Sequence, residues 1–335
     1  MPDVLAAIGW NDDVAAAVEA AHRPDAQPGR VSRVDRGVVT VLTEAGRVRA
    51  KRGAVPPATG DWVLVDTGDE PTVVEVLPRR SAFVRGDPMD GAARNAQVVA
   101  SNVDTVFVTQ SLDNGPNVRR LERELVLAFQ SGADPVVVLT KADLQPDGVD
   151  PAELSGSAAG VPVIVTSAVT GQGIDELRAY TGPGRTVALV GASGVGKSTL
   201  VNTLVGDEIR ATGAVRATDQ RGRHTTTTRE LVLLPGGGVL VDTPGLRAVT
   251  LWLSDEGFRR AFADVEALAR ECRFHDCAHD REPGCAVQAA VARGDLDEAR
   301  VAHYRDLDAE LDRVAIRDAE RERAARAGRR PRRAR

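Results

Sequence analysis

The sequence contains few aromatic residues, few lysines and few cysteines. Aromatic side chains make up 3% of the 335 residues, so the hydrophobic cores must be built from Val, Leu, Ala and Ile. Lysine occurs at only three positions, Lys51, Lys141 and Lys197, and arginine supplies the remaining basic charge. The three cysteines all fall between residues 272 and 285. Their odd number and close spacing argue against a disulfide framework and favour a metal site in a reducing compartment.

Long apolar runs are also absent. Runs such as 136–139 and 186–190 are far shorter than the ~20 residues that a membrane helix needs. The first residues, MPDVLAAIGWNDDV, show no basic start followed by an apolar block, so we expect no signal peptide, no membrane partner and a cytoplasmic location. The net charge of -5 excludes a uniformly basic surface but allows a local basic patch. The length favours two or three domains.

A glycine-rich sequence in the middle of the chain predicts a phosphate-binding loop. Residues 184–199 read GRTVALVGASGVGKST, in which an apolar strand leads into the P-loop pattern and then into a helix. We expect Lys197 to reach the β- and γ-phosphates and the Ser198 hydroxyl to bind Mg²⁺. The phosphate-binding residues predicted here are Gly191, Ala192, Ser193, Gly194, Val195, Gly196, Lys197, Ser198 and Thr199.

Two further segments predict that the nucleotide carries guanine. Residues 136–143 read VVVLTKAD, a buried strand that ends in Thr140, Lys141, Ala142 and Asp143. The Asp143 carboxylate can accept hydrogen bonds from N1–H and the 2-amino group of guanine, a donor pair that adenine lacks. A second apolar strand, 161–165, ends in TSA, so Ser167 and Ala168 are expected to close over the base. Thr140 stands where the common motif has Asn, which exchanges an amide for a hydroxyl.

The order of these motifs is unusual. Asp242, in the sequence DTPG, is expected to hold Mg²⁺ through water, and the Gly245 N–H is expected to contact the γ-phosphate. A threonine among 225–228 should contact Mg²⁺, and the sequence does not say which one. TKAD and TSA precede the P-loop and DTPG, as in circularly permuted GTPases. DTPG therefore leads directly into the C-terminal segment, which the γ-phosphate can move.

The catalytic group is less clearly marked. Ras-like proteins place a glutamine after the DxxG glycine to orient the attacking water, but this chain has Leu246 there. His224, in GRHTTT, is the only histidine between residues 94 and 249. Our hypothesis is that His224 orients the water once a partner orders the loop, and the alternative is a solvated loop histidine.

A cluster of metal-ligand residues follows the nucleotide motifs. Residues 272–285 read CRFHDCAHDREPGC. Cys272, Cys277, His279 and Cys285 would form one tetrahedral, structural zinc site, because four protein ligands leave no position open for water. His275 is a competing ligand, since spacing alone does not choose between the two histidines.

The flanking segments complete a multidomain plan. Short alternating strands between residues 31 and 85 predict an OB-like β-barrel, in which Trp62 is either a core residue or a base-stacking residue. The last ten residues, RAGRRPRRAR, form either a solvated tail or an RNA-binding arm. The expected segments are an N-terminal extension at 1–30, the barrel at 31–85, a circularly permuted α/β P-loop GTPase domain at 94–249, a mainly α-helical zinc-binding domain at 250–320 and a basic tail at 321–335.

These motifs together resemble the ribosome small-subunit-dependent GTPase A family. The resemblance runs from about residue 30 to about residue 315 and includes GDWV (60–63), TKADL, GASGVGKST, GRHTTT, DTPG and the Cys/His cluster. It implies a monomeric GTPase that uses GTP/GDP, Mg²⁺ and one Zn²⁺. It also implies that the protein binds the 30S ribosomal subunit and 16S rRNA late in subunit maturation, and that the subunit stimulates hydrolysis.

Two other functions fit part of the sequence. An RNA-binding adaptor with GTP as a slow structural ligand is compatible with Leu246, and it would show no partner-stimulated turnover. A permuted GTPase of the large subunit would leave the barrel and the metal cluster without a role.

Overall fold

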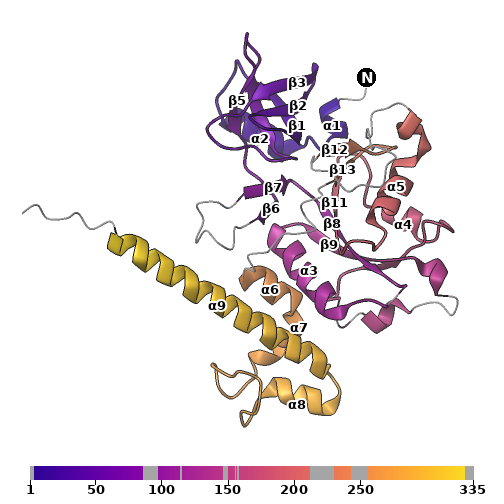
Figure 1. The fold of residues 1–335 in the computed structure, drawn as a ribbon, viewed down its shortest axis with the longest axis vertical. Helices are drawn as coiled ribbons and strands as arrows, with labels where there is room; N and C mark the ends of the chain where they lie inside the picture. The colour runs from indigo at the N-terminus through magenta and orange to yellow at the C-terminus, as the bar shows by residue number, and fades with distance from the viewer. Residues whose placement is uncertain are drawn as a thin grey trace, which may run out of the picture.

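A computed structural model gives the fold of the chain. It describes residues 4–85, 97–113, 115–145, 150–154, 156, 158–211, 230–242 and 255–328. Figure 1 shows a small barrel at one end, a sheet with helices on both faces in the centre, and a helical part at the other end. Among the described residues, no helix is both long enough and apolar enough to cross a membrane.

The barrel confirms the expected N-terminal fold. Its strands are β1 (Gln27–Val34), β2 (Val38–Thr43), β3 (Gly46–Lys51), β4 (Trp62–Asp66) and β5 (Thr72–Val76). Their order is β1-β2-β3-β5-β4, and β4 pairs again with β1, so the barrel is closed. Trp62 is only 2% exposed, which makes it a core residue rather than a free stacking surface.

Two short helices precede the barrel. They lie within residues 1–30, for which the sequence predicted only an N-terminal extension. They are α1 (Val4–Ala7) and α2 (Asp12–Ala20), and the Asn11 side chain caps α2 by accepting the Val14 N–H at 3.0 Å. Leu5 and Ile8 join the cluster of buried side chains around Trp62. The extension therefore closes one side of the barrel core.

The central sheet holds the nucleotide motifs. Its strands are β8 (Thr105–Ser111), β9 (Asp134–Thr140), β10 (Val163–Val165), β11 (Thr186–Val190), β12 (Glu230–Leu233) and β13 (Val239–Asp242), in the order β10-β9-β8-β11-β13-β12. All neighbouring pairs are parallel except β12–β13. The carboxyl ends of the parallel strands therefore meet at one edge of the sheet, where ligands bind in such folds.

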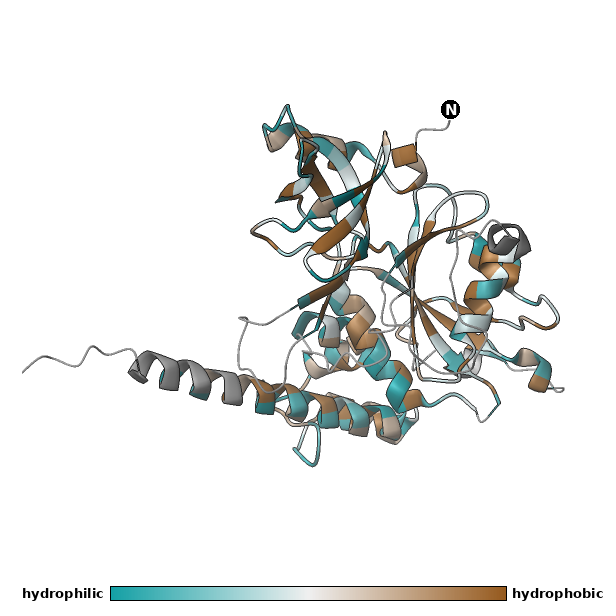
Figure 2. Ribbon diagram, turned by 45° about the horizontal axis from the view of Figure 1, so that its top comes forward, coloured by the Kyte–Doolittle hydropathy of each residue, from teal (hydrophilic) through white to brown (hydrophobic). Residues whose placement is uncertain are grey.

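Helices cover both faces of this sheet. They are α3 (Val118–Ser131) on one face, and α4 (Ile174–Arg178) and α5 (Lys197–Ala211) on the other, with 3₁₀ turns η1 (Ala142–Leu144) and η2 (Pro151–Leu154). Successive residues of β8 face opposite sides of the sheet. Val106 belongs to the same buried cluster as Leu121 of α3, and Phe107 belongs to the same buried cluster as Leu200 of α5. Figure 2 shows the resulting hydrophobic strands between more polar helices.

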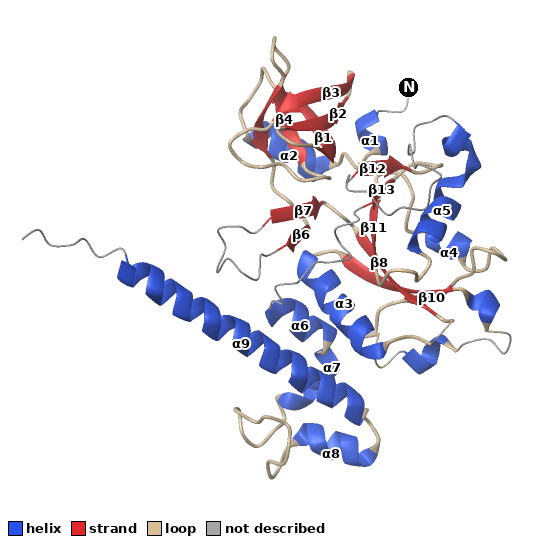
Figure 3. Cartoon of the chain, in the orientation of Figure 1, coloured by secondary structure: helices blue, strands red, loops and turns tan. Residues whose placement is uncertain are grey.

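One buried guanidinium joins the barrel to the central sheet. Arg30 of β1 is 1% exposed and donates to the carbonyl oxygens of Gly60 (3.1 Å) and Asn102 (2.9 Å). It also donates to the Thr186 hydroxyl (2.9 Å) at the start of β11 and to the Ile8 carbonyl. Burial lowers the pKa of Arg30 to about 10, so the side chain stays charged at neutral pH. The hairpin of β6 (Ala82–Arg85) and β7 (Gln97–Ser101) lies beside this junction (Figure 3).

The C-terminal part is helical, as expected. It consists of α6 (Asp255–Ala261), α7 (Ala263–Ala269), α8 (Ala286–Arg293) and α9 (Glu298–Gly328). The start of α9 packs through Val301, Tyr304 and Leu307, and its far end projects from the body (Figure 1).

Buried ion pairs attach the helical part to α3. Arg300 of α9 contacts Glu122 of α3 and Asp264 of α7, each at 2.6 Å. Glu122 is 1% exposed, and its other oxygen is in hydrogen-bond contact with His303 Nδ1. A more exposed pair, Arg123 with Glu310, lies nearly three turns beyond Arg300 along α9. Helix α3 is therefore shared between the central sheet and the C-terminal helices.

Candidate active site and metal centre

The P-loop forms as predicted between β11 and α5. All five residues of β11 are buried, and Lys197 is the first residue of α5. Gly191 has φ +143°, and a Cβ there would lie 2.4 Å from the Thr109 carbonyl oxygen, so only glycine fits. The Lys197 ammonium donates to the carbonyl oxygens of Gly191 (2.7 Å) and Ala192, and so lies folded against the loop. Ser198 and Thr199 are exposed at the start of the helix.

The predicted guanine-binding residues lie at the same edge of the sheet. Lys141 has φ +61°, and its Nζ lies 2.6 Å from Asp113 Oδ2. Asp143 lies in the η1 turn, where the Ser167 hydroxyl donates to its Oδ1 at 2.5 Å. The backbone N–H of Ala142 donates to the Thr166 carbonyl at 3.1 Å. The TKAD and TSA segments are thus bound to each other, which fixes the Asp143 carboxylate for a ligand.

Thr140 connects the base side of the site to the phosphate side. Its hydroxyl lies 2.5 Å from the Val195 carbonyl of the P-loop and 3.2 Å from the Gln110 carbonyl. The Thr side chain is 5% exposed, so this shared hydrogen bond is protected from water. The hydroxyl that stands in place of the common Asn therefore still supplies a donor to the P-loop backbone.

A cavity of about 220 Å³ lies between the two sides. Thr140, Lys141, Asp143 and Ala168 line it from the base motifs. Gly196 and Thr199 line it from the P-loop and α5. One concave site therefore brings together motifs that are distant in the sequence, from Thr140 to Thr199, and its polar and apolar walls suit a nucleoside.

The predicted switch residues lie mostly outside the described residues. Asp242 ends β13, which pairs in parallel with β11, so its backbone reaches the same edge as the P-loop. His224, Gly245, Leu246 and the threonines 225–228 lie outside the described part of the chain, as does the arginine-rich end at 329–335. Their roles, and the Mg²⁺ ligands Ser198 and Asp242, remain predictions.

One carboxyl group near the P-loop could not be identified from the sequence. Glu124 of α3 accepts a hydrogen bond from the Gln110 side chain at 2.8 Å, and burial raises its pKa to about 7. The charge of Lys197 acts on it in the opposite direction. In the sequence, Glu124 is one charge in an amphipathic helix, and only the packing of α3 on β8 brings it to the site.

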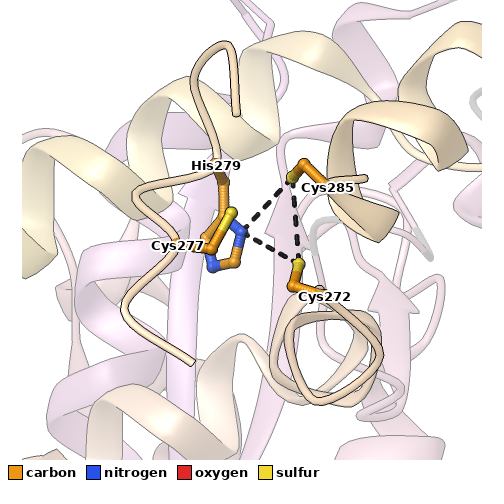
Figure 4. A group of neighbouring side chains, drawn as sticks. All are labelled: Cys272, Cys277, His279 and Cys285. Atoms are coloured by element: carbon orange, nitrogen blue, oxygen red, sulfur yellow. Dashed lines mark hydrogen bonds between the residues drawn. The ribbon is translucent and has the colours of Figure 1, made fainter. Parts of the chain in front are cut away.

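The four predicted zinc ligands converge in the helical part (Figure 4). The ligand atoms of Cys272, Cys277, His279 and Cys285 lie within 4.8 Å of one another. Cys272 Sγ is 3.8 Å from Cys285 Sγ, and His279 Nδ1 is 3.6 Å from both sulfurs. A tetrahedral ion with Zn–S bonds of ~2.3 Å places two sulfurs ~3.8 Å apart, so the geometry fits zinc. His275 is exposed and does not belong to the cluster.

Neighbouring groups hold the metal-binding loop in place. The Glu282 carboxylate accepts the backbone N–H groups of Ala278 (3.0 Å), Asp280 (2.9 Å) and Arg281 (3.1 Å). The backbone N–H of Glu282 itself and these three bonds lower the pKa of the Glu282 carboxyl to about 2. The Gln288 amide donates to the His279 carbonyl at 2.7 Å. Hydrogen bonds of this kind, made to the residues around the ligands, orient the ligand side chains before the ion binds.

The cluster yields a prediction about zinc. His279→Ala should lower bound zinc from one ion per chain toward none, and it should lower the melting temperature of the helical part. His275→Ala should keep the ion, because this side chain lies outside the cluster. Metal analysis of the purified variants checks this. Zinc lost from His275→Ala and kept by His279→Ala would overturn the assignment.

The base side of the site yields a second prediction. Asp143→Asn should weaken GTP binding roughly tenfold to hundredfold, because a charged acceptor of two hydrogen bonds is lost. XTP should bind this variant better than GTP, since xanthine carries a C2 oxygen that accepts from the Asn amide. Titration with fluorescent nucleotides measures both, with Asp175→Asn on exposed α4 as the control. Unchanged GTP affinity in Asp143→Asn would contradict the predicted role.

Comparison with known proteins gives the family of the chain. The family model described as RsgA GTPase matches residues 76–252. A protein of Streptomyces coelicolor named small ribosomal subunit biogenesis GTPase RsgA is 47% identical over 332 residues, which cover 96% of this chain and 90% of that relative.

Solved structures show the same fold. The crystal structure of YjeQ from Thermotoga maritima matches with a TM-score of 0.63 and 28% identity, covering 85% of this chain and 98% of that one. The structure of YloQ, titled a circularly permuted GTPase, matches with a TM-score of 0.59 and 23% identity, covering 87% and 96%. The chain belongs to the RsgA GTPase family and is an enzyme that hydrolyses GTP.

Proposed function

We propose that this GTPase acts on the small ribosomal subunit and assists its late maturation. The observation that carries the proposal is the 47% identity over nearly the full length of a relative named for small-subunit biogenesis. That match covers 96% of the chain, so it extends over the barrel and the helical zinc part as well as the nucleotide domain. Work on the ribosome would place the protein in the cytoplasm, and we propose that it acts there as a monomer.

The nucleotide roles follow from the positions of the side chains. We assign guanine recognition to Asp143, phosphate binding to the P-loop backbone with Lys197, and Mg²⁺ coordination to Ser198 and, through water, Asp242. The Thr140 contact with the Val195 carbonyl supports a single binding site, because it holds the base-binding segment against the phosphate loop. When bound, Mg²⁺ would neutralise the charge that develops on the phosphates during hydrolysis.

Contact with 16S rRNA is supported by basic side chains on the barrel. Arg47, Arg49 and Lys51 alternate along β3, and all three are exposed. Alternate residues of a strand share one face, so these cations form a row directed to solvent. Lys51 is paired with Glu70, which leaves the two arginines as the stronger candidates for phosphate contacts.

The connections between the parts of the molecule suggest how a change of the bound nucleotide could alter the surfaces that we propose bind RNA. We propose the division into segments 31–85, 94–249 and 250–320, with an extension before and a basic tail after them. The DTPG segment leads into α6, and α6 packs on α3 beside the Glu122–Arg300 pair. Loss of the γ-phosphate could therefore be transmitted to the helical part through both connections.

The proposal predicts which ribosomal particle stimulates hydrolysis. Purified small subunits should raise GTP turnover at least tenfold above that of the protein alone, and large subunits should not. Phosphate release under saturating GTP measures this, with Lys197→Ala as the inactive control. No stimulation by either particle would favour an RNA-binding adaptor, and stimulation by the large subunit alone would contradict the proposed partner.

We propose His224 as the group that orients the attacking water, because Leu246 has no polar group to do so. His224→Ala should lower subunit-stimulated turnover by roughly a hundredfold and leave GTP affinity within twofold, within the usual contribution of acid–base groups. His22→Ala, on the N-terminal segment, is the control. Full stimulated turnover in His224→Ala would assign the task to another group.

A further inference from the structure

An exposed aromatic residue lies on the loop between α7 and α8. Phe274 is 41% exposed, whereas every other aromatic side chain among the described residues is buried or half-buried. Figure 1 shows this loop at the end of the molecule opposite the barrel. In a chain with 3% aromatic residues, a phenyl ring that faces water contributes little to the core. A single exposed apolar side chain is common on protein surfaces, so the neighbours of Phe274 decide whether it marks a contact site.

An arginine is held against this ring. The guanidinium carbon of Arg273 lies 5.4 Å from the ring centroid of Phe274. The Arg273 backbone N–H donates to the Gly284 carbonyl at 3.1 Å. Its stem packs so closely on Gly284 that an added Cβ there would lie 3.0 Å from the Arg273 Cβ. Gly284 therefore binds the Arg273 backbone and packs against the start of its side chain, and the guanidinium places a positive charge beside an exposed aromatic surface.

The loop that carries the pair is fixed as well. Phe274 lies between the metal-cluster residues Cys272 and Cys277, and Glu282 binds three backbone N–H groups on the far side of the loop. A contact surface that is ordered before binding loses less conformational entropy when a partner arrives.

The charges near the pair do not exclude an anionic partner. Asp280 is paired with Arg305 at 3.0 Å, and the Glu282 carboxylate is occupied by backbone N–H groups. Arg281 is exposed on the same loop, and Asp276 supplies one opposing charge. Because the charges nearly balance, binding at this surface must depend on stacking more than on net positive charge.

We propose that Phe274 and Arg273 form a stacking platform for an unpaired base of ribosomal RNA. The ring stacks on the base, and the guanidinium contacts the base or the adjoining phosphate. RNA fits better than a protein partner, because the exposed residues that flank Phe274 in the loop are Arg273, His275 and Asp276, which do not form an apolar patch. This inference rests on the proposed action on the small subunit.

Binding to purified small subunits tests the platform. Full-length, zinc-loaded Phe274→Ala, bound to a non-hydrolysable GTP analogue, should bind the subunit roughly fivefold to a hundredfold more weakly than the unaltered protein, the range for loss of one stacked base. Phe274→Tyr should restore the affinity to within threefold. Ile316→Ala, an exposed apolar side chain on α9 of the same helical part, is the matched control and should change it less than twofold.

Chemical footprinting of the 16S rRNA gives a second readout that a merely structural role would not move. The unaltered protein should protect one or a few unpaired bases that Phe274→Ala leaves reactive, while all other protections persist. Zinc content and basal GTP turnover should be equal in all variants. Equal affinity and equal footprints in Phe274→Ala would overturn the platform, as would an equal loss in Ile316→Ala. If the unaltered protein does not bind small subunits, the proposed function itself fails.

Discussion

The arrangement of the molecule depends on one buried arginine. Arg30 belongs to the barrel, yet it donates to the Thr186 hydroxyl at the first residue of the strand that ends in the P-loop. Its other hydrogen bonds reach the N-terminal segment, the Gly60 turn and the Asn102 carbonyl. A buried charge is stable only with such complete pairing, because desolvation is costly. Trp62 covers the guanidinium at 5.5 Å and shields it further from water.

A second anchor lies on the other side of the nucleotide domain. Helix α3 carries Glu122, which binds Arg300 of the helical part, and Glu124, which binds Gln110 beside the P-loop. The Gln110 carbonyl in turn lies near the Thr140 hydroxyl. Both flanking parts are thus attached to elements that also support the nucleotide site. A change at the phosphates can therefore reach both flanking parts through these contacts.

The sequence predicted those parts of the site that are continuous in the chain. The P-loop, the TKAD strand and the Cys/His cluster could be predicted because their spacing is dictated by backbone geometry around a phosphate, a base and a metal ion. The closed barrel followed from alternating strands and frequent turns. The motif order predicted the permuted nucleotide domain, since parallel strands bring their carboxyl ends to one edge whatever their order in the chain.

Contacts between distant segments were not predictable in the same way. The Thr140–Val195 hydrogen bond joins residues 55 positions apart, and the exchange of Asn for Thr gave no sign of it. Glu124 and Arg30 are ordinary charges in the sequence, and only packing makes them a carboxyl with a raised pKa and a buried link between domains. The choice of His279 over His275 also required the fold of the loop, because both histidines have acceptable spacing.

The central claim is that the nucleotide state controls attachment to the small subunit. The most direct measurement is co-sedimentation of the protein with purified small subunits in the presence of a non-hydrolysable GTP analogue, of GDP, or of no nucleotide. We expect retention with the analogue and release with GDP, with affinities that differ at least tenfold. Equal retention in all three conditions would show that the flanking parts bind independently of the nucleotide site, and would contradict control by the nucleotide.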